Sequence, residues 1–194
     1  VKLGGQGAPL VPVGEEYLFT DYNTLINLGG FANITKKIKD NLIAYDICPI
    51  NIVFNHLSEK MGFKYDDRGY IASIGKINED LFSQLQILNY YKKDPPKSLG
   101  IEWVNDQIHS ILKNFQDVPI KDLMNTFSNH FAFEIAKNIG DQDKVLITGG
   151  GAYNDYLIDR IKNLTNSKIT IPDSEIIEYK EALIFSFLGL LRVL

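Results

Sequence analysis

A glycine-rich segment near the end of the chain, VLITGGGAYN (residues 145–154), contains the residue types that bind phosphate groups. A short apolar run leads into Gly149, Gly150 and Gly151, and a helix is expected to follow. Glycines let backbone N–H groups approach a phosphate or a nucleotide closely, above all where a strand runs into a helix. The alternatives are a tight turn without a ligand and an NAD-binding fold. The G-x-G-x-x-G spacing of an NAD-binding fold is absent, and so is the lysine that follows the glycines of a P-loop. The sequence therefore favours neither of these two nucleotide-binding folds.

A second segment, NLGGFANIT (residues 27–35), joins two β-like runs through Gly29 and Gly30. Taken alone it indicates a β-turn. Together with residues 145–154, it gives one short chain two glycine-rich loops at strand ends. A nucleotide held between two such loops is typical of the actin-like ATPase and sugar kinase fold.

The elements that carry these loops follow from the hydrophobic periodicity and the turn signals. Three antiparallel strands come first and alternating helices and strands follow, which indicates the α/β class. The predicted strands are 24–28, 31–35, 42–47, 144–148 and 168–171. The predicted helices are 51–61, one opened by Asn78, 102–115, 120–139, 152–163 and a terminal helix from Glu178 onward.

Composition narrows the classes of partner. A net charge of −4 and a pI of about 5.4 give no footprint for nucleic acid. The only cysteine, Cys48, excludes an internal disulfide and a Cys-rich zinc site, and fits a reducing, cytoplasmic setting. The apolar run 182–194 is shorter than the roughly 20 residues that span a bilayer, so we expect no membrane segment. The three histidines are far apart in the sequence and predict no metal site.

Five motifs together carry a family resemblance. GGQGAPLVP, NLGGFANIT, PPKSLG, TGGGAYN and EAL occur in this order over nearly all of the 194 residues. In these motifs the chain resembles the anhydro-N-acetylmuramic acid kinases. The resemblance implies an actin-like, ribonuclease H-like ATPase lobe. It also implies a kinase that uses ATP, Mg²⁺ and water to open the 1,6-anhydro ring and phosphorylate the 6-oxygen in cell-wall sugar recycling.

The resemblance also implies the extent of the chain and its partners. Residues 1–194 would form one lobe, the C-terminal part of a two-lobed kinase, without the N-terminal lobe and its first phosphate loop. The catalytic Asp of the family would stand just before Val1, so no catalytic residue is assigned within the chain. We expect the isolated chain to be inactive as a kinase. The expected partners are the sugar, ATP and a second copy in a homodimer.

Site residues are carried over by their place in the motifs. The second phosphate loop would contain Asn27, Gly29, Gly30 and Asn33. The adenosine loop would contain Thr148, Gly149, Gly150, Gly151 and Asn154. The substrate-binding residues would be Gly4, Gly5, Gln6, Gly7, Asp46, Asn51 and Glu181. Glu181 is placed at the start of the last helix, where an acidic residue would also be favoured by the helix dipole alone.

One loop departs from the family pattern. Where the family has Asp-Thr-Gly-Pro-Gly-Asn, this chain reads Asp-Ile-Cys-Pro-Ile-Asn at residues 46–51. Both glycines are replaced, by Cys48 and Ile50, so side chains stand where a close backbone approach was possible. The change leaves a second hypothesis open, a non-catalytic nucleotide- or sugar-binding module of the same fold. Cys48 itself is interpreted as a small buried hydrophobic residue.

Overall fold

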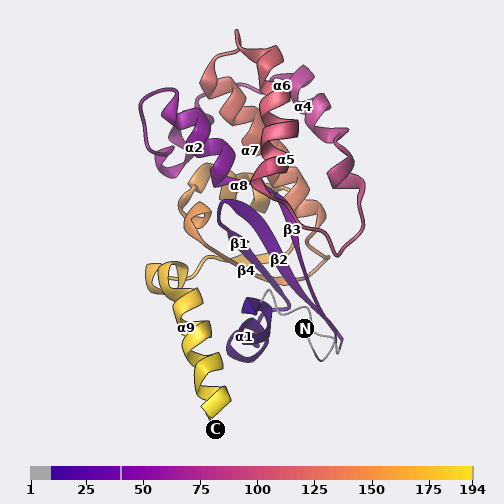
Figure 1. Ribbon diagram of the computed structural model, residues 1–194, viewed down its shortest axis with the longest axis vertical. Coiled ribbons are helices and arrows are strands. Elements are labelled where there is room, and N and C mark those ends of the chain that lie inside the picture. Colours follow the sequence, from indigo (N-terminus) through magenta and orange to yellow (C-terminus); the bar gives the residue numbers. More distant parts are fainter. Residues whose placement is uncertain (1–9, 40, 194) are drawn as a thin grey trace.

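A five-stranded mixed sheet organises the chain in this computed structural model, which describes residues 10–39 and 41–193 (Figure 1). The strand order is β3-β2-β1-β4-β5. The first three strands form an antiparallel meander, and β4 and β5 join it in parallel. The strands are β1 (Thr24–Leu28), β2 (Phe31–Ile38), β3 (Asn41–Pro49), β4 (Lys144–Thr148) and β5 (Lys168–Thr170).

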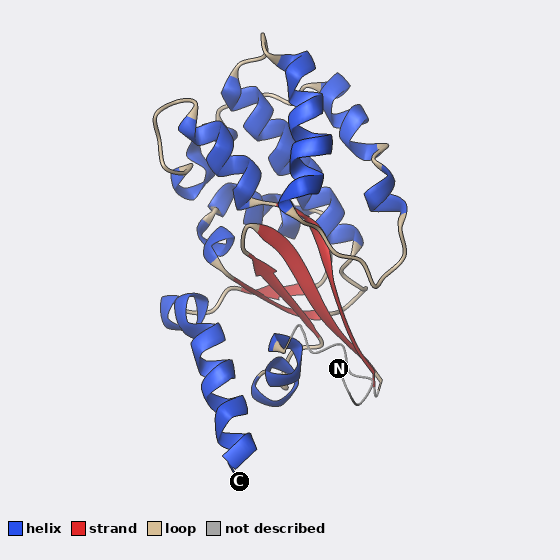
Figure 2. Cartoon of the chain, viewed as in Figure 1, coloured by secondary structure: helices blue, strands red, loops and turns tan. Residues whose placement is uncertain are grey.

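Helices form a layer on one face of this sheet (Figures 1 and 2). At its centre lies α7 (Ile120–Lys137), whose apolar residues recur every three or four positions. Its Phe127 and Phe131 are fully buried, and Phe131 meets Phe54 of α2 edge-on, with ring centroids 5.6 Å apart. Burying one such ring contributes roughly 1.5–3 kcal/mol. The remaining helices of the layer are α2 (Asn51–Glu59), α3 (Tyr70–Ser73), α4 (Glu79–Gln86), α5 (Ile101–Trp103), α6 (His109–Leu112) and α8 (Asp155–Asn163).

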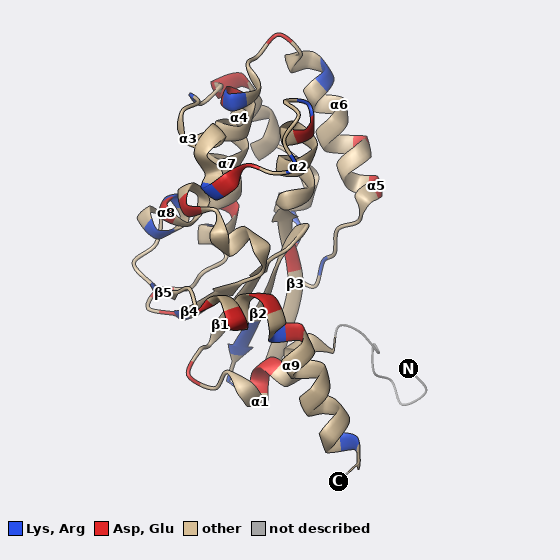
Figure 3. Cartoon of the chain, turned by 90° about the vertical axis from the view of Figure 1, so that its left-hand side faces the viewer, with Lys and Arg blue, Asp and Glu red and all other residues tan. Residues whose placement is uncertain are grey.

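Two helices lie apart from this layer. α1 (Val11–Leu18) and α9 (Ser174–Val193) pack against each other at the opposite end of the molecule (Figures 1 and 3). Pro12 stands in the first turn of α1, where its missing N–H has no helical partner to lose. Across the described residues, no helix is long and apolar enough to cross a membrane.

All five predicted strands are present in the predicted order along the chain, although β2 and β3 are longer than predicted. Several helical details differ from the prediction. α1 was not expected. The predicted helix 152–163 begins only at Asp155, because Gly150–Tyr153 form a separate 3-10 helix. The predicted helix 102–115 divides into α5, a π-helical stretch at Val104–Ile108, α6 and a 3-10 turn at Lys113–Phe115.

The start of the terminal helix was also misplaced. α9 begins at Ser174 and not at Glu178, because Asp173 stands at its N-terminus, where Oδ1 accepts a hydrogen bond from the Ile176 N–H at 3.4 Å. Glu181 therefore lies about two turns into α9 and not in its first turn. The dipole of the helix N-terminus, which falls off within the first turn, does not explain an acidic residue there.

Candidate functional site

A row of polar residues crosses four neighbouring strands on one face of the sheet. Asn27 on β1 pairs with Asn33 on β2 and with Thr148 on β4, and Asn33 pairs with Asp46 on β3. Paired residues on adjacent strands point to the same face. The last pairing depends on a β-bulge, because the register shifts between Ala32 and Asn33. Without that shift Asn33 would lie opposite an apolar residue, so the bulge completes the polar row.

Three members of this row, Asn27, Asn33 and Asp46, form the floor of a cavity of about 550 Å³. Val11 and Pro12 line it from α1. The opposite face of the same strands carries the buried apolar core, as the alternation of side chains along a strand requires. The other lining residues are Ile34, Thr35, Ala44 and Tyr45 of the sheet, Pro96, Lys97 and Ser98 of one loop, and Lys180 and Glu181 of α9.

Asp46 is the acidic group on the floor of this first cavity. Its Oδ2 accepts a hydrogen bond from the Leu99 N–H at 2.8 Å, which fixes the carboxylate beside the 96–98 loop. Burial raises the pKa of Asp46, and the bond from Leu99 lowers it in part. The backbone of Asp46 binds the same loop, since its N–H donates to Lys97 O at 3.0 Å. The residue is thus held rigidly, with a carboxylate suited to accept hydrogen bonds from hydroxyl groups.

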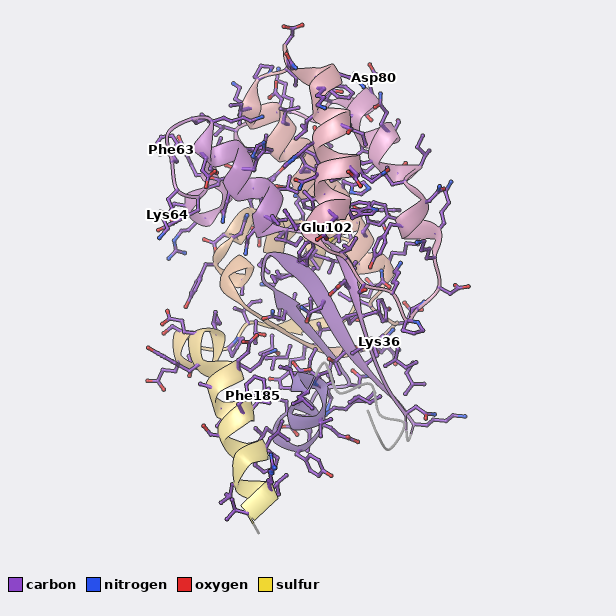
Figure 4. All side chains as sticks on the ribbon, in the orientation of Figure 1. Lys36, Phe63, Lys64, Asp80, Glu102 and Phe185 are labelled. Atoms are coloured by element: carbon purple, nitrogen blue, oxygen red, sulfur yellow. The ribbon has the colours of Figure 1, made fainter. Side chains whose placement is uncertain are left out.

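A second cavity of about 400 Å³ lies beside the glycine-rich loop. Gly150, Gly151 and Asn154 line it, as does Asn51 at the start of α2. Its remaining lining residues are Phe54 and Asn55 of α2, and Tyr65, Asp66, Asp67, Arg68 and Tyr153. The loop after α2, which carries Phe63 and Lys64, projects from the same side of the molecule (Figure 4). The two predicted groups of site residues are mixed between the cavities. Asn27 and Asn33, predicted in the second phosphate loop, line the first cavity together with Asp46, which was predicted on the sugar side.

Two of the three glycines in the glycine-rich loop, Gly149 and Gly151, are required by its backbone. Gly149 has φ +81°, a conformation that side chains rarely adopt, and a Cβ there would lie 2.6 Å from Asn27 Oδ1. A Cβ on Gly151 would lie 2.7 Å from the Cβ of Leu28. At Gly150 an added Cβ meets only Asn51 Nδ2, at 3.9 Å, so this residue faces open space. Such a bare backbone fits a close-bound nucleotide.

Asn154 ends this loop by capping α8. Its Oδ1 accepts a hydrogen bond from the Leu157 N–H at 2.9 Å. The Asp67–Gly69 turn packs directly on it, because a Cβ on Gly69 would collide with Asn154 Oδ1. Arg68 in that turn has φ +53° and bonds Asp155 Oδ2 at 2.9 Å. The turn forms a second wall of the cavity, and nothing in its sequence had suggested this.

The hairpin turn Gly29–Gly30 lines neither cavity but holds α2 in place. The carbonyl of Gly30 accepts hydrogen bonds from the Ile50 and Ile52 N–H groups at 2.8 and 3.3 Å. The Asn51 side chain adds a bond from Nδ2 to Leu28 O at 3.2 Å. Thr148 is buried, also away from both cavities, and its Oγ1 has no hydrogen-bond partner among the described residues. These residues border the site and shape it.

The remaining predicted residues fall as follows. Asn51, predicted on the sugar side, lies in the second cavity beside Gly150. Glu181 lies in the first. Gly4, Gly5, Gln6 and Gly7 lie outside the described residues. Sequence reasoning assigned no role to Lys97 or Lys180, which both line the first cavity. PPKSLG, the segment that contains Lys97, was a signal that could have identified the first of them.

The two side chains that replace the family glycines point into the core. Cys48 and Ile50 are fully buried in the hydrophobic cluster, and neither lines a cavity. Burial raises the pKa of the Cys48 thiol well above its usual range, which confirms the interpretation as a small apolar residue. Neither substituted side chain therefore forms part of the lining of either cavity.

Comparison with known proteins decides the family. A model described as anhydro-N-acetylmuramic acid kinase matches residues 1–194. The chain belongs to this family. It is 36% identical to the anhydro-N-acetylmuramic acid kinase of Clostridioides difficile, over 97% of this chain and 54% of that protein. To that of Aliivibrio fischeri it is 32% identical, over 100% of this chain and 56% of that protein. The chain spans about half the length of the curated relatives it matches.

Solved structures confirm the fold class. The activator of 2-hydroxyisocaproyl-CoA dehydratase from Clostridium difficile, with bound ADPNP, matches with a TM-score of 0.56 at 17% identity, over 93% of this chain and 65% of that chain. Component A of (R)-2-hydroxyglutaryl-CoA dehydratase from Acidaminococcus fermentans matches with a TM-score of 0.54 at 14% identity, over 90% of this chain and 64% of that chain. Both have the actin-like ATPase fold. The antiparallel meander β1–β3 also differs from the mostly parallel sheet of an NAD-binding fold.

Proposed function

We propose that this chain is the C-terminal lobe of an ATP-dependent kinase that hydrolyses and phosphorylates 1,6-anhydro-N-acetylmuramic acid in cell-wall sugar recycling. The observation that carries the proposal is the polar row Thr148–Asn27–Asn33–Asp46. One end of the row lies in the first cavity, and the other end leads into the glycine-rich loop of the second. A sugar and a nucleotide could thus be held at adjoining positions of one sheet.

The first cavity supplies the groups that a sugar needs. Asn27 and Asn33 offer amide donors and acceptors, and Asp46 offers a carboxylate that accepts hydrogen bonds from hydroxyls. Lys97 of the 96–98 loop adds positive charge to this cavity, and Glu181 of α9 adds a second carboxylate. In the proposed kinase these residues bind and orient the sugar so that its 6-oxygen is aligned with the phosphoryl donor.

The second cavity supplies the groups that a nucleotide needs. Gly150 and Gly151 begin a 3-10 helix, whose first N–H groups have no partner within that helix. The bare backbone at Gly150 leaves room for a ligand to approach. When bound, ATP supplies the phosphoryl group. This chain's contribution is to hold the nucleotide and to exclude water from one side of it.

In the proposed kinase, Mg²⁺ would be bound together with the phosphates of ATP. Among residues 10–39 and 41–193, no three His, Cys, Asp or Glu side chains form a group that could hold a metal ion. Mg²⁺ in kinases is held largely by the phosphates and by one or two carboxylates.

Two binding experiments on the chain test the assignment of the cavities. Titration calorimetry with ATP compares the unmodified chain with Gly150→Val, because a side chain at Gly150 enters open space and leaves the fold intact. We expect Gly150→Val to weaken ATP binding at least about ten-fold at an unchanged melting temperature. NAD serves as the control ligand. Tight binding of NAD, or ATP binding that is insensitive to Gly150→Val, would contradict the assignment.

The sugar cavity is tested in the same way with Asn33→Ala, because Asn33 is exposed and its truncation should cost little stability. We expect the affinity for 1,6-anhydro-N-acetylmuramic acid to fall several-fold. The matched control is Asn163→Ala, at the far end of α8 and outside both cavities. Equal losses in the two variants would argue against the first cavity as the sugar site.

The kinase and the non-catalytic alternative differ in one measurement. Alone, the chain should show no turnover of the sugar with ATP. If the chain is a kinase lobe, mixing it with the N-terminal half of the Clostridioides difficile relative should restore formation of the phosphorylated sugar. Binding of both ligands without turnover in that mixture would favour a non-catalytic module. The cytoplasmic location and the homodimer belong to the same proposal, and light scattering of the reconstituted protein tests the homodimer.

A further inference from the structure

A buried ion pair joins α1 to α9 across most of the sequence. Lys180 Nζ donates to Glu15 Oε1 at 2.6 Å, and the two side chains are 3% and 4% exposed. The other two ion pairs in the described part of the chain, Arg68–Asp155 and Lys137–Glu134, each include a side chain that is more than half exposed. The Glu15–Lys180 pair is thus the one whose two partners are both removed from water.

Stability alone does not account for this pair. Two charges lose their hydration when buried, and apolar residues of similar size in their place are often neutral or stabilising. The second carboxylate oxygen, Glu15 Oε2, is buried without a hydrogen-bond partner among the described residues. An unpaired buried oxygen adds to the cost. What the pair does supply is a fixed geometry between the two helices.

Further contacts fix α1 in the same position. An added Cβ on Gly14 would collide with Ile184 Cγ2, so the backbone of α1 lies directly on α9. At the far end of α1, Lys37 of β2 donates to the carbonyl of Phe19 at 3.0 Å. α1 is thereby attached to α9 along one side and to the sheet at its C-terminal end.

The attachment bears on the first cavity. The start of α1 gives two of its lining residues, Val11 and Pro12, and α9 gives Lys180 and Glu181. Glu181 follows the paired lysine directly in the chain. The ion pair therefore sets the distance between two walls of the cavity, over the floor of Asn27, Asn33 and Asp46.

We propose that Glu15 and Lys180 are positioning residues, which hold α1 and Glu181 on either side of the sugar. The inference rests on the proposed assignment of the first cavity to the sugar. Glu15 does not line the cavity, and its effect on a bound sugar is exerted through Lys180 and the register of the two helices. Loss of the pair should therefore loosen the walls and weaken sugar binding without unfolding the chain.

The test replaces the charges while keeping the volume. In the double variant Glu15→Met/Lys180→Met, two unbranched apolar side chains fill the same space, and the melting temperature should stay close to that of the unmodified chain or rise. We expect the α1 amides to exchange with deuterium at least about ten-fold faster. The affinity for 1,6-anhydro-N-acetylmuramic acid, measured by calorimetry, should fall about ten-fold. Lys137→Met, which removes the exposed partner of another ion pair, is the matched control and should change neither quantity.

The two measurements separate this inference from the proposed function. If the unmodified chain does not bind the sugar, the assignment of the first cavity fails, and the exchange of α1 still decides whether the pair holds the helices. Unchanged exchange in the double variant, or unchanged affinity in a chain that binds the sugar, would overturn the inference. If the double variant does not fold, Glu15→Gln is measured instead. The α1 amides should again exchange faster, and the affinity for the sugar should again fall.

Discussion

Acid should destabilise this protein through one buried histidine. His130 on α7 is fully buried among Phe82, Tyr91 and Phe131, and neither ring nitrogen has a hydrogen-bond partner among the described residues. Burial, helped by the charge of Lys137, lowers the pKa of His130 from 6.5 to about 4. The folded chain therefore keeps the ring neutral over a pH range in which the unfolded chain protonates it.

The sign and size of the effect follow from this difference. Between pH 6.5 and pH 4 the unfolded state binds more protons than the folded state, so the free energy of unfolding falls as the pH falls. A shift from 6.5 to about 4 corresponds to about 3 kcal/mol in total. About 2 kcal/mol of it should be lost between pH 7 and pH 5. Burial raises the pKa values of Asp46 and Glu134, which opposes the trend at lower pH.

The measurement is urea unfolding at pH 7, 6 and 5, for the unmodified chain and for His130→Leu. Leucine has nearly the volume of histidine and no nitrogen to protonate, so the difference between the two chains removes the contributions of the carboxyl groups. The unmodified chain should lose about 2 kcal/mol more than His130→Leu between pH 7 and pH 5. At pH 7 the variant should be no less stable, because it removes two unpaired buried nitrogens. Parallel pH profiles, within about 0.5 kcal/mol, would refute the reasoning.

Three further changes probe the elements that hold the site. Gly149→Ala should lower the free energy of unfolding in urea by about 3 kcal/mol, because φ is +81° and the added Cβ meets backbone atoms. The control Gly30→Ala, with no atom within 4 Å of the added Cβ, should lower it by under about 0.5 kcal/mol. Equal losses in the two variants would contradict the strain argument. Asn154→Ala should cost about 1 kcal/mol by leaving the Leu157 N–H uncapped, and Asn154→Asp should restore most of it; a neutral alanine variant would show that the cap is dispensable. Asp143→Ala should lower the free energy of unfolding by roughly 2–3 kcal/mol, because the carboxylate accepts three hydrogen bonds where β1 and β4 begin. Thermal unfolding measures this loss, and a clearly smaller loss would contradict the expectation.

The sequence predicts those parts of the fold that depend on short-range pattern. β1 and β4 were predicted at their observed bounds, because a short apolar run with β-branched residues that ends in glycines is typical of a strand followed by a turn. The missed and misplaced helix starts each have a specific cause. Pro12 and Gly14 obscured α1, whose Gly14 is required by contact with a residue 170 positions later, Ile184. The N-terminus of α9 depended on a single side chain, Asp173.

The sequence predicted a site between two glycine-rich loops, whereas the structure has two cavities, only one of which is lined by such a loop. The glycine-rich loop carried its own signal, since φ +81° at Gly149 demands glycine whatever lies around it. The assembly of the first cavity had no such signal. It requires the register of three strand pairs and a bulge, and it takes two walls from α1 and α9, which meet only through tertiary packing. Such contacts cannot be inferred from the spacing of residues along the chain.

Asn27 lies between the first cavity and the glycine-rich loop. It lines the first cavity, and its Oδ1 would lie 2.6 Å from a Cβ added at Gly149. The contact exists because β1 and β4 run in parallel and end at the same edge of the sheet, with Asn27 opposite Thr148. In sheets that contain parallel strands, ligands collect at such carboxyl ends. A ligand held by the glycine-rich loop and one held by the polar row would therefore share Asn27 as a neighbour. Under the proposed function, this common neighbour would bring the phosphoryl donor and the sugar close to each other, as group transfer between them requires.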